Sequence, residues 1–413
     1  MDAKFRQAAL DYHQYPTPGK VRQSSSKPMR NAHDLALAYS PGVAVACEAI
    51  ASDPDSARHF TGRSNLVAVI SNGTAVLGLG NIGPLASKPV MEGKAALFRH
   101  FAGIDAFDLE IDASTPERFI EVVAALEPTF GGINLEDIRA PECFVIEDEL
   151  RRRMAIPVFH DDQHGTAIVC AAAVTNALLL QAKELSQVRL VTSGAGAAAL
   201  ACVDLLVTMG LPAANVTLTD IDGVITRDRT GMGANMARYA RAGPACRLDE
   251  VIAGADIFLG LSAPGVLRAE LLPLLADRPL ILALANPEPE IRPEVVRAVR
   301  PDAIVATGRS DYPNQVNNLL CFPFIFRGAL DIGATEINAA MKIAAVRALA
   351  ALAREGGPCP FSSDYIIPDP FDPRLIGAIS PAVATAAMAS GVATRPIADL
   401  DGYRDVLAAI AQP

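Results

Sequence analysis

Residues 188–210 have the sequence VRLVTSGAGAAALACVDLLVTMG. The apolar beginning of this stretch predicts a β-strand, and its apolar second half predicts a helix that the final glycine ends. Between the two, residues 194–199 match the GxGxxA pattern of dinucleotide-binding loops. In such a loop Gly194 permits a tight turn, Gly196 lets backbone amides approach a pyrophosphate, and Ala199 lets the helix pack against the strand.

The chain continues from this loop as an alternation of strands and helices. Apolar runs predict strands at residues 216–220, 256–261, 280–285 and 303–307. This alternation is typical of a parallel, doubly wound sheet. Asp220 ends the strand after the loop, where an acidic side chain can accept hydrogen bonds from the adenosine ribose. We therefore expect an α/β fold with a Rossmann-type domain, and not merely a glycine turn in an ordinary sheet. The expected coenzyme-binding residues are Ser193, Gly194, Ala195, Gly196, Ala197, Ala198 and Asp220.

Upstream of this domain the sequence mixes element types. Residues 34–50 are predicted to be helical around a break at Ser40-Pro41-Gly42, and helical spacing recurs at 90–101, 116–126 and 166–182. We place a domain boundary near Pro157. Three parts are expected, namely an N-terminal α/β domain over 1–157, the coenzyme domain over 158–385 and a helical tail over 386–413.

A second glycine-rich stretch, Gly78-Leu79-Gly80-Asn81-Ile82-Gly83, also matches the dinucleotide pattern. Two apolar runs, 66–71 and 74–79, flank Asn72-Gly73, a dipeptide that tolerates positive φ, and they predict a β-hairpin before the glycines. Pro84 follows in place of an expected helix start. We therefore predict a glycine-rich turn here and not a coenzyme site.

The composition excludes several classes of protein. The 413 residues are 51% hydrophobic and carry a formal net charge of −10, which argues against non-specific nucleic-acid binding. The longest apolar run, 167–180, is too short to span a bilayer, and the N-terminus shows no export signal. The seven cysteines form no CxxC pair. We expect a cytoplasmic protein that does not bind membranes.

Two acidic pairs interrupt apolar surroundings, namely Glu136-Asp137 and Asp161-Asp162. Both follow strand-like residues, so both are expected at strand ends, where α/β proteins collect ligands. Carboxylate oxygens in this number suit Mg²⁺ or Mn²⁺ and not zinc. Each pair taken alone is more often a solvated loop or a helix cap. His160 and His164 flank the second pair, and such histidines are more often structural than ligands.

Two further polar side chains lie in apolar stretches. Lys94 occupies a helical run, where it either extends to water or is held near a cleft as a base with a lowered pKa. Tyr39 directly precedes the Ser-Pro-Gly break, where it is either core packing or a phenol that points into a site. The residues alone leave both alternatives open.

Taken together, six ordered segments resemble the malic enzyme family in its short bacterial form. FHDDQHGTAIV (159–169) is similar to that family's signature. The other five are AYSPGVA (38–44), LGLGNIGPLASKPVMEGKAALF (77–98), NLEDI (134–138), LANPEPEI (284–291) and SDYPNQVNNLLCFPFIFRGALD (310–331). Some bacterial relatives continue into a phosphotransacetylase-like domain. The chain stops near that point, so we expect a stand-alone enzyme or a truncated one.

The resemblance implies an activity and a role for each residue. The expected reaction is the oxidative decarboxylation of L-malate to pyruvate and CO2 with reduction of NAD(P). Glu136, Asp137 and Asp162 would be the metal ligands, and Asp161 would be a partner of the catalytic lysine. Lys94 would be the base, and Tyr39 the acid that protonates C3. Asn286 and Asn318 would lie near the substrate, and Asn286 also near the nicotinamide.

Two departures from the family bear on specificity. Longer members carry an arginine that contacts a substrate carboxylate, where this chain has Asn72-Gly73-Thr74-Ala75. Relatives that prefer NADP often have Lys or Ser after the ribose-binding strand, where this chain has Asp222, which would repel the 2′-phosphate. We therefore predict that NAD is preferred over NADP, unless Arg227 or Arg229 folds back onto the loop.

Two rival functions are compatible with the sequence. One is a malolactic-type or other β-decarboxylating hydroxyacid enzyme on the same scaffold. The other is a non-catalytic nucleotide-binding or regulatory protein, against which the intact Tyr39, Lys94 and metal-site acids count. A Tyr- and Pro-rich N-terminal segment would suit an arm that packs on a neighbour, and the resemblance implies a homodimer or higher homo-oligomer.

Overall fold

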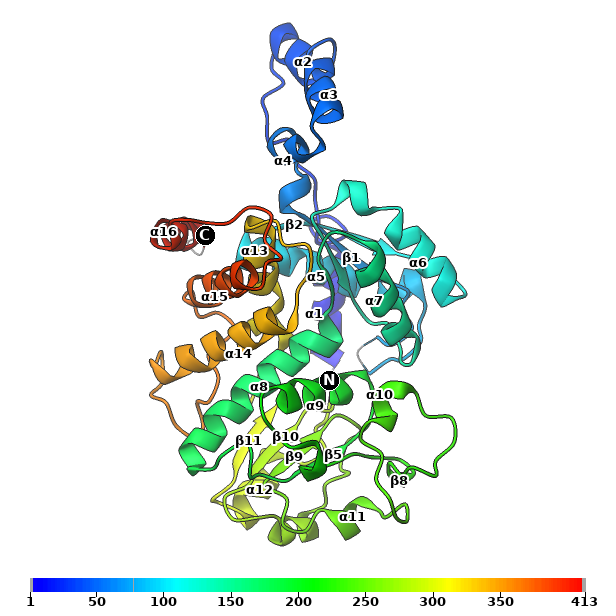
Figure 1. Ribbon diagram of the computed structural model, residues 1–413, viewed down its shortest axis with the longest axis vertical. Helices are drawn as coiled ribbons and strands as arrows, with labels where there is room; N and C mark the ends of the chain where they lie inside the picture. Colours follow the sequence, from blue (N-terminus) through cyan, green and yellow to red (C-terminus); the bar gives the residue numbers. More distant parts are fainter. Residues whose placement is uncertain (1–2, 77, 411–413) are drawn as a thin grey trace.

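The computed structural model describes residues 3–76 and 78–410, so Leu77 of the predicted hairpin and 411–413 of the predicted tail lie outside it. Two parallel sheets form its centre (Figure 1). The first has the strand order β2-β1-β3-β4, and the second the order β11-β10-β9-β5-β6. The strands of the first sheet are β1 (Leu66–Ser71), β2 (Asp105–Glu110), β3 (Gly132–Leu135) and β4 (Val158–His160).

The second sheet confirms the predicted doubly wound arrangement, because all its pairings are parallel. Its strands are β5 (Leu190–Ser193), β6 (Val216–Thr217), β9 (Ile257–Gly260), β10 (Leu280–Ala283) and β11 (Ile304–Thr307). The predicted strand at 216–220 is divided, since its second part, β7 (Thr219–Asp220), forms a separate antiparallel pair with β8 (Gly223–Val224). α9 (Ala197–Thr208) follows β5 as predicted.

The predicted hairpin over 66–79 is wrong. β1 is buried along nearly its whole length and pairs in parallel with β2 on one side and β3 on the other, so no edge remains for a hairpin partner. The residues after Asn72 form a closed loop, in which Ile82 and Gly83 donate backbone hydrogen bonds to the Gly73 carbonyl. A Cβ on Gly73 would lie 2.2 Å from the Gly83 oxygen, which explains the need for glycine there.

The expectation that no helix starts at Pro84 is also wrong. α5 (Pro84–Ala102) begins at that residue, with Gly83 as its N-cap. Proline is well suited to the first helical position because the missing N–H has no partner there in any case. The unit β1-loop-α5-β2 is therefore a parallel crossover, as its register requires. Between β2 and the second sheet lie the helices α6 (Pro116–Ala124), α7 (Glu142–Arg153) and α8 (Asp161–Gln181).

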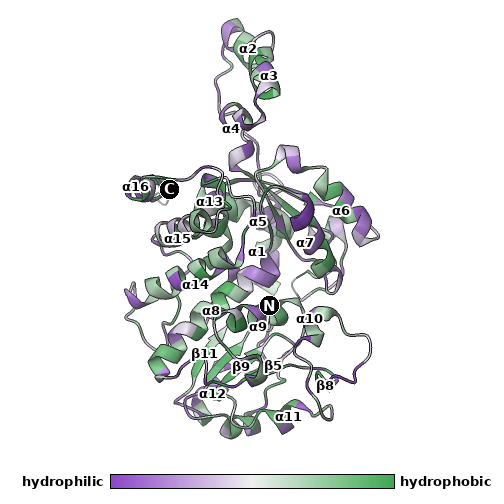
Figure 2. Cartoon of the chain, viewed as in Figure 1, coloured by the Kyte–Doolittle hydropathy of each residue, from purple (hydrophilic) through white to green (hydrophobic). Residues whose placement is uncertain are grey.

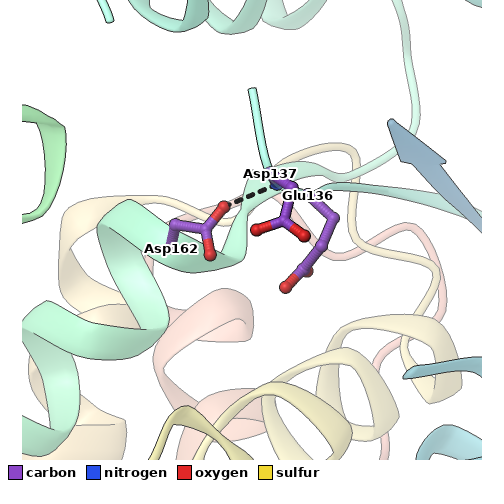
Figure 3. A group of neighbouring side chains, drawn as sticks. All are labelled: Glu136, Asp137 and Asp162. Carbon is purple, nitrogen blue, oxygen red and sulfur yellow. Dashed lines mark hydrogen bonds between the residues drawn. The ribbon is translucent and has the colours of Figure 1, made fainter. Parts of the chain in front are cut away.

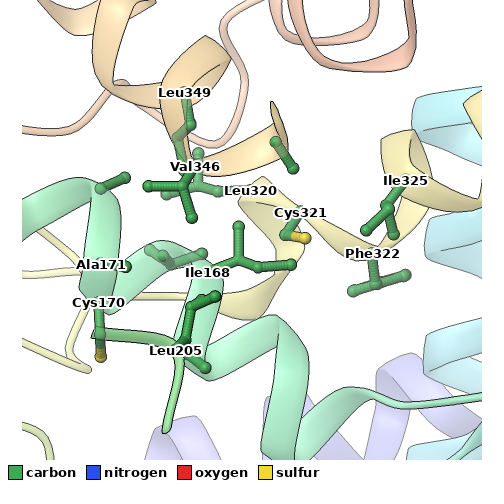
Figure 4. Close-up of a cluster of buried hydrophobic side chains, with 14 of the residues drawn as sticks. Ile168, Cys170, Ala171, Leu205, Leu320, Cys321, Phe322, Ile325, Val346 and Leu349 are labelled. Atoms are coloured by element: carbon green, nitrogen blue, oxygen red, sulfur yellow. The ribbon is translucent and has the colours of Figure 1, made fainter. Parts of the chain in front are cut away.

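α8 is the central buried helix and joins the two sheets. It follows β4 without an intervening loop and packs mainly against α9 and α14 (Ala339–Arg354). Its apolar side chains belong to the largest core cluster, which includes Ile168, Leu205 and Val346 (Figure 4). The other helices after α9 are α10 (Ala234–Ala237), α11 (Leu248–Val251), α12 (Pro293–Val299), α13 (Phe322–Asp331), α15 (Leu375–Ala389) and α16 (Leu400–Ile410).

The N-terminal segment forms an arm. α1 (Ala3–Gln14) is followed by α2 (Ala32–Ala38) and α3 (Val43–Ser52), which confirm the predicted helices around Ser40-Pro41-Gly42. α2 and α3 project away from both sheets (Figure 1), and none of their residues is buried. We call Ala32–Ser52 the arm. Figure 2 colours much of the arm as hydrophobic, and the side chains of Leu35, Leu37 and Val45 are exposed.

Two stretches are long and apolar enough to cross a membrane by length and composition alone. One is α8, which is mostly buried in the protein. The other is the arm, where Tyr39 to Gly42 separate helices of 7 and 10 residues. Each of these is far shorter than the roughly 20 residues of a bilayer-spanning helix.

The predicted boundary near Pro157 lies close to the junction of the two sheets. β4 pairs with β3, so residues 158–160 belong with the first sheet although the predicted division groups them with the second. The C-terminal half of the chain also contacts the predicted N-terminal domain, since α13 packs against α5. The three-part division itself stays a prediction.

Candidate active site

Three acidic side chains meet where two neighbouring strands end. β3 leads into Glu136 and Asp137, and β4 leads into Asp161 and Asp162 at the start of α8. Because β3 and β4 are adjacent and parallel, both acidic pairs emerge at one edge of the sheet. Glu136, Asp137 and Asp162 each place one oxygen within 4.8 Å of the others (Figure 3). The Asp137 amide donates a hydrogen bond of 2.8 Å to Asp162 Oδ2.

These acids fit a divalent cation. Burial raises the pKa of Glu136 to about 7 and that of Asp162 to about 6, because negative charge is costly away from water. A cation among the three would supply the missing counter-charge. Oxygens spaced within 4.8 Å suit Mg²⁺ or Mn²⁺, whose octahedral shells place ligands about 2.1 Å from the metal. The donor set, all carboxylate, matches the hard cations that the sequence predicts.

Lys94 lies next to this cluster and does not extend to water. It is 7% exposed, and its Nζ lies 2.5 Å from Asp161 Oδ2 and 3.0 Å from Glu136 Oε1. The ammonium also lies 4.1 Å from the ring centre of Phe322. Burial opposes the charge of Lys94, but Asp161 and Glu136 outweigh it, so the pKa of Lys94 is held above its usual value. Lys94 is therefore buried among acids and does not extend to water, but the lowered pKa expected of a base there is wrong, because these acids raise it.

The two asparagines that the resemblance singles out flank this centre. Asn318 begins η6 (Asn318–Leu320). Its side chain and that of Asp161 lie side by side against Gly165, where an added Cβ would clash with both. Asn286 lies in the loop after β10, close to the backbone of Gly78. A Cβ added to Gly78 would lie 3.3 Å from the backbone oxygen of Asn286. The glycine-rich loop before α5 therefore borders the coenzyme domain.

Tyr39 does not join this group. It is the C-cap of α2 on the arm and is 72% exposed. The structure therefore brings together Lys94, Asp161 and the metal-site acids, but it leaves the predicted acid on a projecting element (Figure 1).

The predicted dinucleotide loop has the required geometry. Gly194 has φ 105°, and a Cβ there would lie 2.3 Å from the Leu261 oxygen, so only glycine fits. Gly196 is the N-cap of α9, and a Cβ on it would meet nothing within 4 Å. The space in front of this helix start is open, as the approach of a pyrophosphate requires. Ala199 is buried, in keeping with close helix packing.

The residues after β7 form a charged cluster. Arg229 folds back onto the loop, with Nη2 2.6 Å from Asp220 Oδ2 and 2.9 Å from Asp222 Oδ2. The position predicted to bind the ribose therefore carries two carboxylates and one guanidinium. Arg227 instead donates to the Ala240 carbonyl.

Two residues near the centre were not predicted. Phe322 lies under the Lys94 ammonium, and nothing in its apolar segment distinguishes it from core. Glu147 is 4% exposed and accepts hydrogen bonds from Gln163 at 3.3 Å and His164 at 2.7 Å. The hydrogen bond of His164 to Glu147 agrees with the structural alternative for this histidine. A signal for Glu147 was available, because it lies on the same helix face as the buried Cys143, Ile146 and Leu150.

Comparison with known proteins extends these observations. The chain matches the family models "Malic enzyme, N-terminal domain" over residues 18–151 and "Malic enzyme, NAD binding domain" over residues 163–368. It is 62% identical to the NADP-dependent malic enzyme of Escherichia coli K12, over 98% of this chain and 55% of that protein. It is also 62% identical to the NAD-dependent malic enzyme of Rhizobium meliloti 1021, over 97% of this chain and 54% of that protein. The chain spans about half the length of these curated relatives.

A solved structure covers the whole fold. The malic enzyme from Pyrococcus horikoshii Ot3 is 40% identical to this chain and superposes with a TM-score of 0.92. The match covers 99% of this chain and 96% of that one. The likeness therefore includes both sheets and is not limited to the dinucleotide-binding part.

Proposed function

The chain belongs to the malic enzyme family, and from that premise we propose that it converts L-malate to pyruvate and CO2 while it reduces NAD(P). The observation that carries the proposal is the position of Lys94, buried between Asp161 and Glu136 beside a three-carboxylate cluster. A hydroxyacid oxidation needs a base next to a Lewis acid, and these residues would supply the base and the ligands that hold a metal ion as the Lewis acid.

Each residue then has a task. Glu136, Asp137 and Asp162 would hold Mg²⁺ or Mn²⁺, which when bound polarises the C2 oxygen of malate and stabilises negative charge on it. Lys94 would accept the proton of the C2 hydroxyl in its neutral form, which a cation bound to the neighbouring acids would favour, and Asp161 would then hold the resulting ammonium through the 2.5 Å contact. Asn286 and Asn318 position the substrate and the nicotinamide. Tyr39 donates the proton that reaches C3 after CO2 has left.

We expect activity that depends entirely on a divalent metal. Purified protein with L-malate, NAD or NADP and Mn²⁺ should form pyruvate and reduced coenzyme in equal amounts, and excess EDTA should abolish the reaction. Mn²⁺ should also raise the Tm of the wild-type protein more than that of an Asp162→Asn variant. Activity that survives EDTA would exclude the metal model, and lactate formed without reduced coenzyme would establish the malolactic-type rival.

The exposed Tyr39 leads to a proposal about assembly. The arm exposes Leu35, Leu37, Tyr39 and Val45, each more than half accessible. Exposed apolar patches of this kind often mark protein–protein contacts. We propose that the protein is a homodimer in which each arm packs on the neighbour and brings Tyr39 to that subunit's Lys94.

Within the same framework, we propose a cytoplasmic enzyme with the domain division 1–157, 158–385 and 386–413.

The charge balance after β7 underlies a proposal about the coenzyme. Asp220, Asp222 and Arg229 together carry one net negative charge, which disfavours a 2′-phosphate, so we propose that NAD is preferred. Arg229 is at the same time the group that a 2′-phosphate would engage. NADP is therefore expected as a slower alternative.

The ratio of kcat/KM for the two coenzymes tests this proposal. The wild-type protein should favour NAD, and Arg229→Ala should lower kcat/KM for NADP by about tenfold or more, because one charge-assisted phosphate contact is lost. The NAD value should change much less. Arg227→Ala, whose guanidinium faces a backbone carbonyl, is the matched control. A clear NADP preference of the wild type would contradict the proposal.

A further inference from the structure

A cavity of about 310 Å³ lies at the foot of the arm, where residues between 54 and 64 meet segments near 127–131, 329–335 and 394–395. Three arginines from distant parts of the sequence line it. Arg58 comes from α4 (Ala57–Phe60), Arg63 from η2 (Arg63–Asn65), and Arg395 from the segment after α15. None of the proposed catalytic, metal or coenzyme residues lines this cavity.

The three guanidinium groups have few acidic partners. Arg63 donates only to backbone carbonyls, Nε to Pro128 at 3.0 Å and Nη2 to Glu127 at 3.2 Å. Arg395 donates Nη2 to the Leu330 carbonyl at 2.5 Å. Within the described part of the chain, no carboxylate lies within 4.0 Å of either guanidinium. Arg58 has one distant ion pair, at 3.9 Å to the exposed Asp55.

The arginines also repel one another. The pKa of Arg395 is lowered by burial and by the charge of Arg58, with a smaller contribution from Arg63, although Asp331 and Asp55 oppose this shift from a greater distance than an ion pair. The Nε atom of Arg395 is buried without a hydrogen-bond partner. Two acids, Asp55 and Glu127, also line the cavity. The Glu127 carboxylate accepts a hydrogen bond from the Ala155 amide at 3.0 Å. An anion in the cavity would relieve this repulsion.

We propose that this cavity is a binding site for a small phosphate-bearing anion. Guanidinium groups present planar pairs of N–H donors that match phosphate oxygens, and three of them around one cavity suit a dianion better than a single carboxylate. The volume limits the ligand to inorganic phosphate or a small phosphorylated molecule. Bound there, the anion would link the foot of the arm to the C-terminal segment.

Calorimetric titration with inorganic phosphate tests the proposal without reference to catalysis. Saturating NAD is included throughout, so that phosphate does not report on the dinucleotide loop. Wild-type protein should bind phosphate saturably, and an Arg63→Gln/Arg395→Gln double variant should bind it at least about tenfold more weakly. Arg404→Gln, which removes an exposed arginine paired with Asp401, is the matched control and should bind like the wild type.

Folding and alternative occupants are controlled separately. The Tm of each variant without phosphate reports on folding, and the single variant Arg395→Gln replaces the double variant if that one unfolds. Tighter binding of phosphoglycolate than of phosphate would identify the ligand as a phosphorylated small molecule, whereas equal or weaker binding would identify free phosphate. The proposal is overturned if the wild type shows no saturable binding of phosphate, or if a folded variant binds phosphate as tightly as the wild type. It is also overturned if a variant keeps its phosphate binding and changes only its oligomeric state.

Discussion

Replacing Lys94 by alanine is expected to lower kcat by about a thousandfold, within the range that positioned general acids and bases contribute. The side chain is the one cation in direct contact with Asp161 and Glu136 among the described residues, and no other amine or imidazole is within 4.0 Å of those two carboxylates. The KM for malate should change far less, because the metal-site acids remain. Steady-state kinetics with saturating Mn²⁺ measures both constants.

The same helix offers a matched control for this variant. Lys88 is on α5 too, but it is partly exposed and pairs with Asp108 and Glu110 outside the site. Lys88→Ala should therefore keep kcat near the wild-type value. Tm and NAD binding of both variants establish that they fold. If folded Lys94→Ala retained the metal-dependent rate, Lys94 would not be the base.

Much of the fold could be predicted because local signals agreed with tertiary structure. The strand-loop-helix at 188–210 was recognised from glycine positions that the backbone requires, as the positive φ of Gly194 shows. The metal-site acids were recognised for a similar reason. Parallel strands end at one edge of their sheet, so acids that follow apolar runs converge there, as Glu136 and Asp162 do.

The errors arose where the deciding partner is distant in sequence. Asn72-Gly73 suits a hairpin locally, but β2 and β3 occupy both sides of β1, and those strands begin more than thirty residues away. Pro84 interrupts the local pattern, but it fits the first position of a helix, and the helix extends from it because α5 packs against β1 and β2. The contact of Arg229 with Asp220 was raised only as a possibility, because nothing local fixes how a long side chain folds back.

Tyr39→Phe is expected to lower the rate of malate decarboxylation to pyruvate by about a hundredfold or more, since the lost hydroxyl is the proposed proton donor. The loss should have little structural cost. The side chain is 72% exposed in the single chain, and phenylalanine keeps the ring for packing on a neighbour. Tyr12→Phe, which is similarly exposed on α1, is the matched control and should leave the rate unchanged. If Tyr39→Phe were fully active, Tyr39 would not be the acid.

A hybrid of two inactive variants decides whether Tyr39 acts across the subunit interface. In a dimer of one Tyr39→Phe subunit and one Lys94→Ala subunit, exchange of the arms pairs the intact Tyr39 of the second with the intact Lys94 of the first. One of the two sites is then complete, so purified hybrid should recover about half of the wild-type kcat per dimer, in accord with an isologous twofold interface. The two subunits carry different affinity tags, and co-expression followed by two-step purification isolates the hybrid. If Tyr39 instead served its own subunit, each site would lack one group and the hybrid would stay inactive. Recovery in the hybrid therefore separates the two arrangements, because neither parent variant alone can produce it.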